Sequence, residues 1–181
     1  EPIRGRKHGN RYFWTMPHDT NLAWVQIGNQ RLPQLNLPPF PLDWRVGGGR
    51  TEVKCLSRLK YFVLEPEEWV RQHWLHHLAH DLNYPAGLMS VEHPLQLNGM
   101  KRRADILCHD RSGNPLLMVE CKRHDVPLSE AVLHQILRYH LALETPLIVI
   151  SNGLKHQAYS YKSNAFQALD SLPSYDSIPA K

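Results

Sequence analysis

The stretch that decides the fold is RADILCHDRSGNPLLMVECK, residues 103–122. It consists of two short apolar runs on either side of turn-forming residues, which is the pattern of a β-hairpin. The turn is centred on residues 112–113, and Asp105 and Glu120 are equally far from that centre. Directly opposed residues point to the same face of a sheet, and side chains alternate with period two. The hairpin therefore predicts Asp105, Glu120 and Lys122 on one face.

Two carboxylates that face each other between apolar strands call for a cation. The Cβ atoms of opposed residues lie about 5 Å apart, and acids this close either share a proton or bind a positive ion. Oxygen ligands favour Mg²⁺ or Mn²⁺ over zinc. The alternative is that Asp105 and Glu120 lie at strand ends, in a solvated charge cluster with Arg103, Lys122 or Arg123.

Hydrophobic periodicity predicts the elements around this hairpin. A helix starts at Glu65-Pro66-Glu67-Glu68, because proline suits a first turn and acids suit the positive end of the helix dipole. The predicted elements are, in order, a hairpin at 51–55 and 60–64, a helix to about residue 82, strands at 88–92, 103–109 and 116–122, a helix at about 128–143, and strands at 147–150 and 156–161. The sequence thus predicts an α/β fold, a mixed central sheet flanked by helices.

The chain divides into three parts by composition. We expect residues 1–42 to be an accessory arm, because they end in the proline cluster Leu37-Pro38-Pro39-Phe40-Pro41. Residues 43–165 form the expected domain, and residues 166–181 a loose tail. Trp14 and Trp24 in the arm either stack on bases or pack on the domain, and packing is the expectation.

Composition excludes several classes of protein. A chain of 181 residues with 42% hydrophobic residues suits one globular domain. The formal charge of +4 is compatible with nucleic-acid binding without being diagnostic of it. Three cysteines without CxxC spacing form neither a disulfide framework nor a zinc knuckle. Since there is neither a secretory signal nor an apolar run of about 18 residues, we expect a soluble, cytoplasmic protein without a membrane span.

These motifs resemble those of a known family. Asp105 with Glu120-Cys121-Lys122, in the order helix, three strands, helix, strand, resembles the restriction-endonuclease-like PD-(D/E)XK core. More narrowly, about residues 50–162 resemble the N-terminal nuclease domain of type I restriction enzyme R subunits. Ala104 stands where the wider fold has the proline that names it. The sequence has no GxxxxGK[ST] loop, so we do not expect the ATP-driven motor of a full R subunit in this chain.

The resemblance implies a role for each site residue. Asp105, Glu120 and the Cys121 carbonyl would hold Mg²⁺, or Mn²⁺ in its place. Lys122 would orient or help deprotonate the attacking water and offset charge at the scissile phosphate. Glu67, rather than Glu68, would be the helix glutamate that faces the site, because it falls inside the apolar stripe of this helix. The stripe consists of Val70, Trp74, Leu75, Leu78 and Leu82.

A second set of residues would contact the nucleic acid or support the site. Gln135 and Tyr139 match the QxxxY element of the R subunits, and core packing is the alternative for Tyr139. Positive charge from four further residues would face the phosphate backbone; these are Lys101, Arg102, Arg103 and Arg123.

The leading hypothesis is a Mg²⁺-dependent DNA endonuclease in a restriction or repair system. Its expected partners are other subunits of that system, and a homodimer is compatible with it. The alternative is a non-catalytic nucleic-acid-binding or assembly module that keeps the nuclease fold. A third hypothesis is a zinc hydrolase that uses His76 and His80, which have metal-ligand spacing on one helix face.

Overall fold

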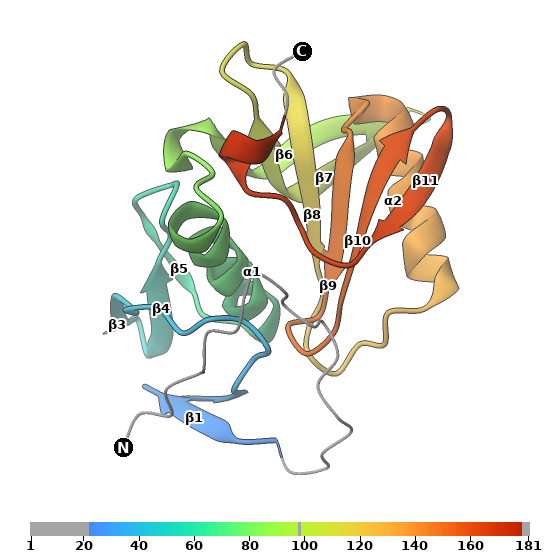
Figure 1. Ribbon diagram of the computed structural model, residues 1–181. Helices are drawn as coiled ribbons and strands as arrows, with labels where there is room; N and C mark the ends of the chain where they lie inside the picture. Colours follow the sequence, from blue (N-terminus) through green and yellow to red (C-terminus); the bar gives the residue numbers. More distant parts are fainter. Residues whose placement is uncertain (1–21, 98, 179–181) are drawn as a thin grey trace.

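A computed structural model describes residues 22–97 and 99–178, without the side chains of Leu97, Ala131, Val132, Leu133, Gln135, Ile136 and Leu141. Its centre is a six-stranded sheet in the spatial order β11-β10-β9-β8-β7-β6 (Figure 1). The strands are β6 (Met89–Leu97), β7 (Met100–His109), β8 (Pro115–Cys121), β9 (Leu147–Ser151), β10 (His156–Lys162) and β11 (Ala165–Leu169). Neighbouring strands are antiparallel except β8 and β9, which are parallel. The predicted mixed α/β architecture is confirmed.

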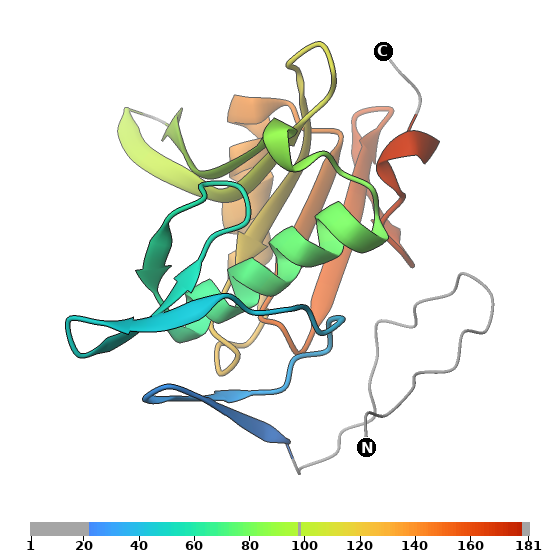
Figure 2. The same ribbon diagram turned by 90° about the vertical axis from the view of Figure 1, so that its left-hand side faces the viewer.

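Two helices cover the two faces of this sheet. In Figure 2, α1 (Pro66–His76) lies in front of the sheet and α2 (Glu130–Leu143) behind it. A π-helical segment, η1 (His77–Asp81), extends α1 close to the predicted end at residue 82. α2 is the crossover that parallel strands require between β8 and β9.

The apolar sequence of β8 follows from burial on both faces. Leu117, Val119 and Cys121 belong to the core cluster that includes Trp74 of α1. Met118 belongs to the second cluster, together with Tyr139 and Ile148. A strand covered on both sides reads as a continuous apolar run rather than an alternating one.

The hairpin between β7 and β8 has the predicted register where it matters for the site. Ile106 pairs with Val119, and Leu107 with Met118. A bulge between Cys108 and His109 then shifts the pairing, so the turn is not the symmetric one expected. The irregularity lies at the tip of the hairpin and leaves the register near Asp105 unchanged.

Two smaller sheets are formed by the strands that precede α1 in the sequence. One is the hairpin of β1 (Trp24–Ile27) and β2 (Gln30–Pro33), and the other joins β3 (Trp44–Gly47), β4 (Arg50–Lys54) and β5 (Tyr61–Val63). The antiparallel pairing of β4 with β5 is the hairpin predicted at 51–55 and 60–64.

Segments expected at the margins of the domain contribute to its core. Leu32 is 0% exposed and Leu35 is 7% exposed, although both lie in the expected arm. After residue 165 the chain forms β11 and a short 3-10 helix, η3 (Tyr175–Ser177), and it buries Leu172 and Tyr175. The expectation of a loose tail at 166–181 is therefore wrong for its described part, residues 166–178. Another 3-10 turn, η2 (Ala86–Leu88), leads into β6.

Candidate active site

Asp105 lies where the pairing of β7 with both neighbouring strands is interrupted. Toward β6, the ladder pairs Val91 with Ile106 and His93 with Ala104, which leaves Glu92 and Asp105 between two pairs. Toward β8, Ile106 with Val119 is the last pair before Asp105. Glu92 has a φ of 52°, an uncommon value for a residue other than glycine. Asp105 therefore lies outside the regular strand pairing on both sides.

The carboxylate of Asp105 is held from two sides. Its Oδ1 accepts a hydrogen bond from Arg71 Nη2 of α1 at 2.7 Å. Its Oδ2 accepts one from the backbone N–H of Cys121 at 2.8 Å. These two bonds tie the helix and the end of β8 to one acidic group, so its position is fixed.

Glu120 is a buried acid with an incomplete set of partners. Its Oε1 accepts a hydrogen bond from Lys122 Nζ at 2.6 Å. Its Oε2 is buried and accepts no hydrogen bond from the described residues. Burial, followed by the charge of Asp105, raises the pKa of Glu120 to about 7, although Lys122 acts in the opposite direction. The sequence-predicted trio of Asp105, Glu120 and Lys122 is therefore brought together, with negative charge in excess.

Arg71 is the main residue that the sequence interpretation did not assign. Its side chain is 8% exposed and pairs with Asp105, with Glu67 at 3.3 Å and with Glu68. Burial alone would lower the pKa of Arg71, but the charges of Asp105 and Glu68 raise it. The signal was present, because an arginine four residues before Leu75 lies on the apolar stripe of the helix.

The two helix glutamates differ in their surroundings. Glu67 is half-exposed, and burial followed by the charge of Asp105 raises its pKa. Glu68 is buried, and it accepts hydrogen bonds from Gln72 Nε2 at 2.6 Å and from Arg58 Nη2 at 3.1 Å. Glu67 is thus the helix glutamate whose charge interacts with Asp105 and Lys122, although Glu68, and not Glu67, is the one buried in the domain.

The donor set fits a hard cation bound through few protein oxygens. Within residues 22–97 and 99–178, no three His, Cys, Asp or Glu side chains are gathered closely enough to hold a metal ion. Mg²⁺ needs only one or two carboxylates, because it keeps several of its waters. The buried and unpartnered Oε2 of Glu120, with Asp105 nearby, is the observation that matches such an ion.

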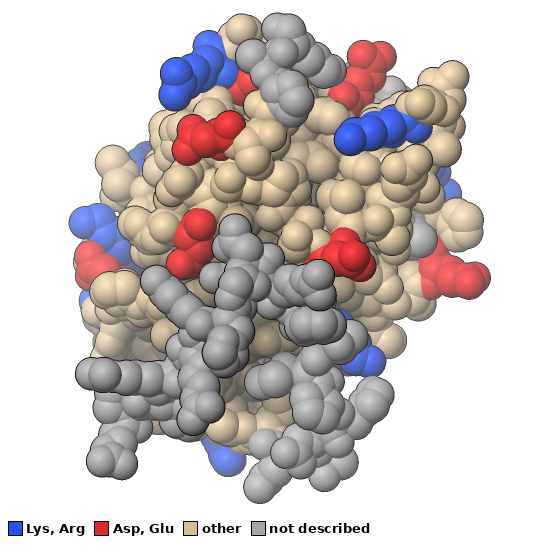
Figure 3. Space-filling view, viewed as in Figure 1, with Lys and Arg blue, Asp and Glu red and all other residues tan. Residues whose placement is uncertain are grey.

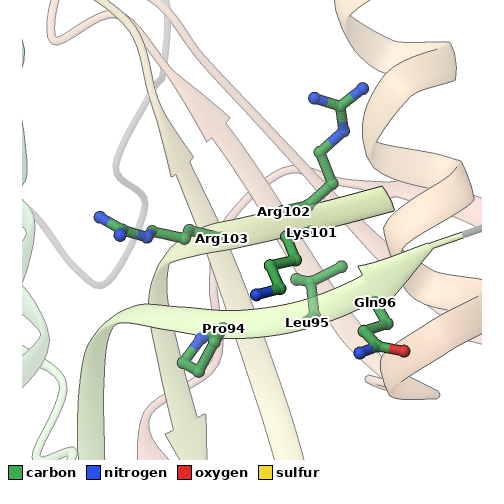
Figure 4. Close-up of a pocket in the computed structure, with 6 residues that line it drawn as sticks. All are labelled: Pro94, Leu95, Gln96, Lys101, Arg102 and Arg103. Atoms are coloured by element: carbon green, nitrogen blue, oxygen red, sulfur yellow. The ribbon is translucent and has the colours of Figure 1, made fainter. Parts of the chain in front are cut away.

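The basic residues named from the sequence lie in two segments, Lys101, Arg102 and Arg103 in β7 and Arg123 after β8. Charges of both signs are scattered over the face seen in Figure 3. Lys101, Arg102 and Arg103 line a pocket at the β6–β7 hairpin together with Pro94, Leu95 and Gln96, and Figure 4 shows Arg102 and Arg103 pointing away from one another. Arg103 lies 3.8 Å from Glu92, and Arg123 pairs with Asp125.

The QxxxY pair is described only in part. Gln135 belongs to α2, but its side chain lies outside the described residues. Tyr139 is 4% exposed and packs in the second core cluster. This burial favours core packing of Tyr139 over contact with nucleic acid.

His76, one of the two histidines of the zinc-hydrolase hypothesis, packs against an aromatic ring. The rings of His76 and His80 lie 5.4 Å apart, and His76 stacks on Phe40 at 3.9 Å. Burial lowers the pKa of His76 to about 4. This stacking gives His76 a packing role, and no third ligand joins the pair among the described residues.

The chain is similar to known proteins in two comparisons. The model of the family described as the N terminus of type I restriction enzyme R proteins matches residues 66–173. Among solved structures, a fragment described as an HsdR subunit of a type I restriction enzyme from Vibrio vulnificus YJ016 is similar, with 20% identity and a TM-score of 0.49. That match covers 62% of this chain and 24% of the other chain. No curated protein sequence matches.

The family model covers the central elements of the fold. It spans α1 to the residues after β11, and therefore includes Glu67, Arg71, Asp105, Glu120 and Lys122. In the part of the chain that the structure describes, no helix is long and apolar enough to span a membrane. The matched stretch covers more than half of the chain, which belongs to the family of type I restriction enzyme R protein N termini.

Proposed function

We propose that this chain is a metal-dependent DNA endonuclease domain of a restriction system, with a PD-(D/E)XK site and Mg²⁺ as its cofactor. The observation that carries the proposal is Glu120, whose buried Oε2 has no hydrogen-bond donor among the described residues. A carboxylate in that state, beside a second carboxylate, is stabilised by a bound cation. Membership in the R-protein family supports the nuclease role.

Asp105 and Glu120 would hold the ion, with the main-chain carbonyl of Cys121 as a further oxygen. Each carboxylate oxygen has two lone pairs, so the hydrogen bonds from Arg71 and Lys122 leave room for a metal. When bound, the ion supplies Lewis-acid polarisation of the phosphoryl group and activates water. Arg71 would keep the Asp105 carboxylate in one orientation.

Lys122 would act as a fixed cation rather than as a base. Burial alone would lower its pKa, but the charge and hydrogen bond of Glu120, with the charges of Asp105 and Glu67, raise it. A lysine that stays protonated offsets the charge that develops on a phosphate during hydrolysis. Glu67 is the carboxylate with an exposed face, and we assign it to orient the attacking water. In-line attack would leave a 3′ hydroxyl and a 5′ phosphate.

The DNA would approach along the exposed basic residues, with Arg103 and Arg123 nearest in sequence to the two acids. The chain spans about a quarter of the R-subunit fragment that it resembles. We therefore propose that other segments or subunits recognise the target and drive movement with ATP. We also assign Gln135 of α2 to the site.

Nicking of supercoiled plasmid tests the proposal. We expect cutting by the unchanged protein in Mg²⁺, no cutting in chelator, and loss of cutting for Glu120→Ala. Glu130→Ala is the matched control, because Glu130 is exposed at the start of α2. Equal cutting by Glu120→Ala and the control would rule out this site. DNA binding without cutting, insensitive to chelator and to Asp105→Asn, would instead favour a non-catalytic binding module.

A further inference from the structure

The N-terminal hairpin places an exposed aromatic ring against the catalytic segment. Trp24 of β1 is 43% exposed. Its ring meets the ring of His124 edge to face, with centroids 5.7 Å apart and an interplanar angle of 87°. His124 follows Lys122 by two residues. The exposed tryptophan therefore lies beside the segment that carries the catalytic lysine.

One cationic side chain lies over this ring, and a second is next in sequence to its ring partner His124. The guanidinium of Arg31 lies 5.4 Å from the centroid of Trp24. Arg123 stands between Lys122 and His124 and has a side chain that is 55% exposed. An exposed aromatic ring with neighbouring arginines is the combination that binds bases by stacking and phosphates by charge.

Trp24 is not needed to anchor its own hairpin. Leu32 and Leu35 already bury their side chains in the core. The carbonyl of Pro33 accepts a hydrogen bond from Trp69 Nε1 at 2.9 Å, and Ala23 O accepts one from Gln34 N at 2.7 Å. The hairpin is thus fixed by other groups, and packing does not account for the exposed part of the Trp24 ring.

We propose that Trp24 is a stacking platform for an unpaired base of the nucleic-acid strand that is cut, with Arg31 and Arg123 binding adjacent phosphates. This inference rests on the proposed nuclease function and names its substrate class, a strand with unpaired bases next to the cut. Two residues span at most about 7 Å, and a stacked strand rises about 3.4 Å per nucleotide. Together with the ring separation of 5.7 Å, this keeps the stacked base within a short stretch of strand from the scissile phosphate.

Binding of fluorescein-labelled oligo(dT) of twelve nucleotides, measured by anisotropy in chelator so that no cutting occurs, tests the proposal. We expect Trp24→Leu to weaken binding roughly 5- to 100-fold, the range for loss of one stacked base, and Trp24→Phe to retain most of the affinity. Trp44→Leu is the matched control, because Trp44 is 45% exposed on the neighbouring small sheet. A labelled blunt hairpin duplex should bind Trp24→Leu and the unchanged protein equally within about twofold.

The outcomes separate this inference from the proposed function. No binding of oligo(dT) by the unchanged protein would overturn the platform. Equal losses of oligo(dT) affinity in Trp24→Leu and Trp44→Leu would also overturn it. So would a loss of affinity of Trp24→Leu for the duplex that equals its loss for oligo(dT). A melting temperature of Trp24→Leu within a few degrees of that of the unchanged protein excludes misfolding. If Trp24→Leu is destabilised, Trp24→Phe replaces it, and a large loss of oligo(dT) affinity in Trp24→Phe would contradict the platform. Plasmid nicking together with normal oligo(dT) binding by Trp24→Leu would contradict the platform and leave the nuclease proposal standing. Selective loss of binding in Trp24→Leu without any nicking by the unchanged protein would contradict the nuclease proposal and leave Trp24 as a base-binding residue of a non-catalytic module.

Discussion

Replacing Glu120 by glutamine should change how the stability of the protein depends on pH. In the folded protein, burial and the charge of Asp105 raise the pKa of Glu120 to about 7 from its ordinary value of 4.5. A carboxyl group whose folded pKa is raised contributes stability that is fully present below pH 4.5 and is lost as pH rises through 7. The unchanged protein should therefore lose stability toward alkaline pH relative to Glu120→Gln.

The magnitude follows from the two pKa values. Between pH 5 and pH 8.5 the free energy of unfolding should fall by about 2.5 kcal/mol more in the unchanged protein than in Glu120→Gln. Lys122, whose own pKa is raised, stays protonated over this range. Its effect on the Glu120 carboxyl group is already included in the pKa of about 7, so Lys122 adds no separate dependence on pH.

Urea unfolding at 25 °C, in chelator and then with Mg²⁺, is the assay. At a Mg²⁺ concentration ten times the dissociation constant, the ion should add about 1.4 kcal/mol to the unchanged protein at pH 8.5 and little to Glu120→Gln. Glu130→Gln, at an exposed position, should behave like the unchanged protein throughout. A pH-independent difference between the unchanged protein and Glu120→Gln would show that the pKa of Glu120 is not raised. Equal Mg²⁺ stabilisation of both proteins would show that Glu120 does not bind the ion.

Three further changes test the surroundings of the site. Arg71→Met should lower the free energy of unfolding by about 3–5 kcal/mol, because it leaves buried acids unpaired; a loss under about 1 kcal/mol by urea unfolding would contradict that. Leu32→Ala should cost about 2–5 kcal/mol by the same assay, whereas Leu59→Ala, at a residue 72% exposed, should cost almost nothing; equal effects would mean that the N-terminal hairpin is not part of the core. Burial lowers the pKa of His156 to about 4 from 6.5, so stability is lost as pH falls through this window, and His156→Gln should remove about 2 kcal/mol of the loss between pH 7.5 and 5; an unchanged acid limb would contradict the burial of this ring.

The register of the central hairpin was predictable because two local signals agree. The turn residues around Gly113 locate the tip, and the apolar runs on either side fix which residues face each other. The bulge next to His109 was not predictable, since it depends on how the turn closes. Because the structure absorbs that irregularity before Ile106, the prediction for Asp105 and Glu120 was insensitive to it.

The parts that the sequence did not predict depend on contacts between distant segments. Arg71 carries no local sign that its partner is Asp105, 34 residues away in the sequence. The burial of Leu35 depends on Gly153, where an added Cβ would lie 2.7 Å from a Leu35 methyl group. The alternation in β11 is weak because it is an edge strand, so the chain after residue 165 looked like a tail.

A crystal of the protein soaked in Mn²⁺ tests directly whether Asp105 and Glu120 bind a metal ion, because anomalous scattering locates the ion without reference to activity. We expect one strong peak about 2.0–2.2 Å from carboxylate oxygens of Asp105 and Glu120, and its loss in crystals of Glu120→Gln. A well-ordered soaked crystal with no peak at this position, or with its peak at His76 and His80 instead, would show that these two carboxylates do not form the metal site.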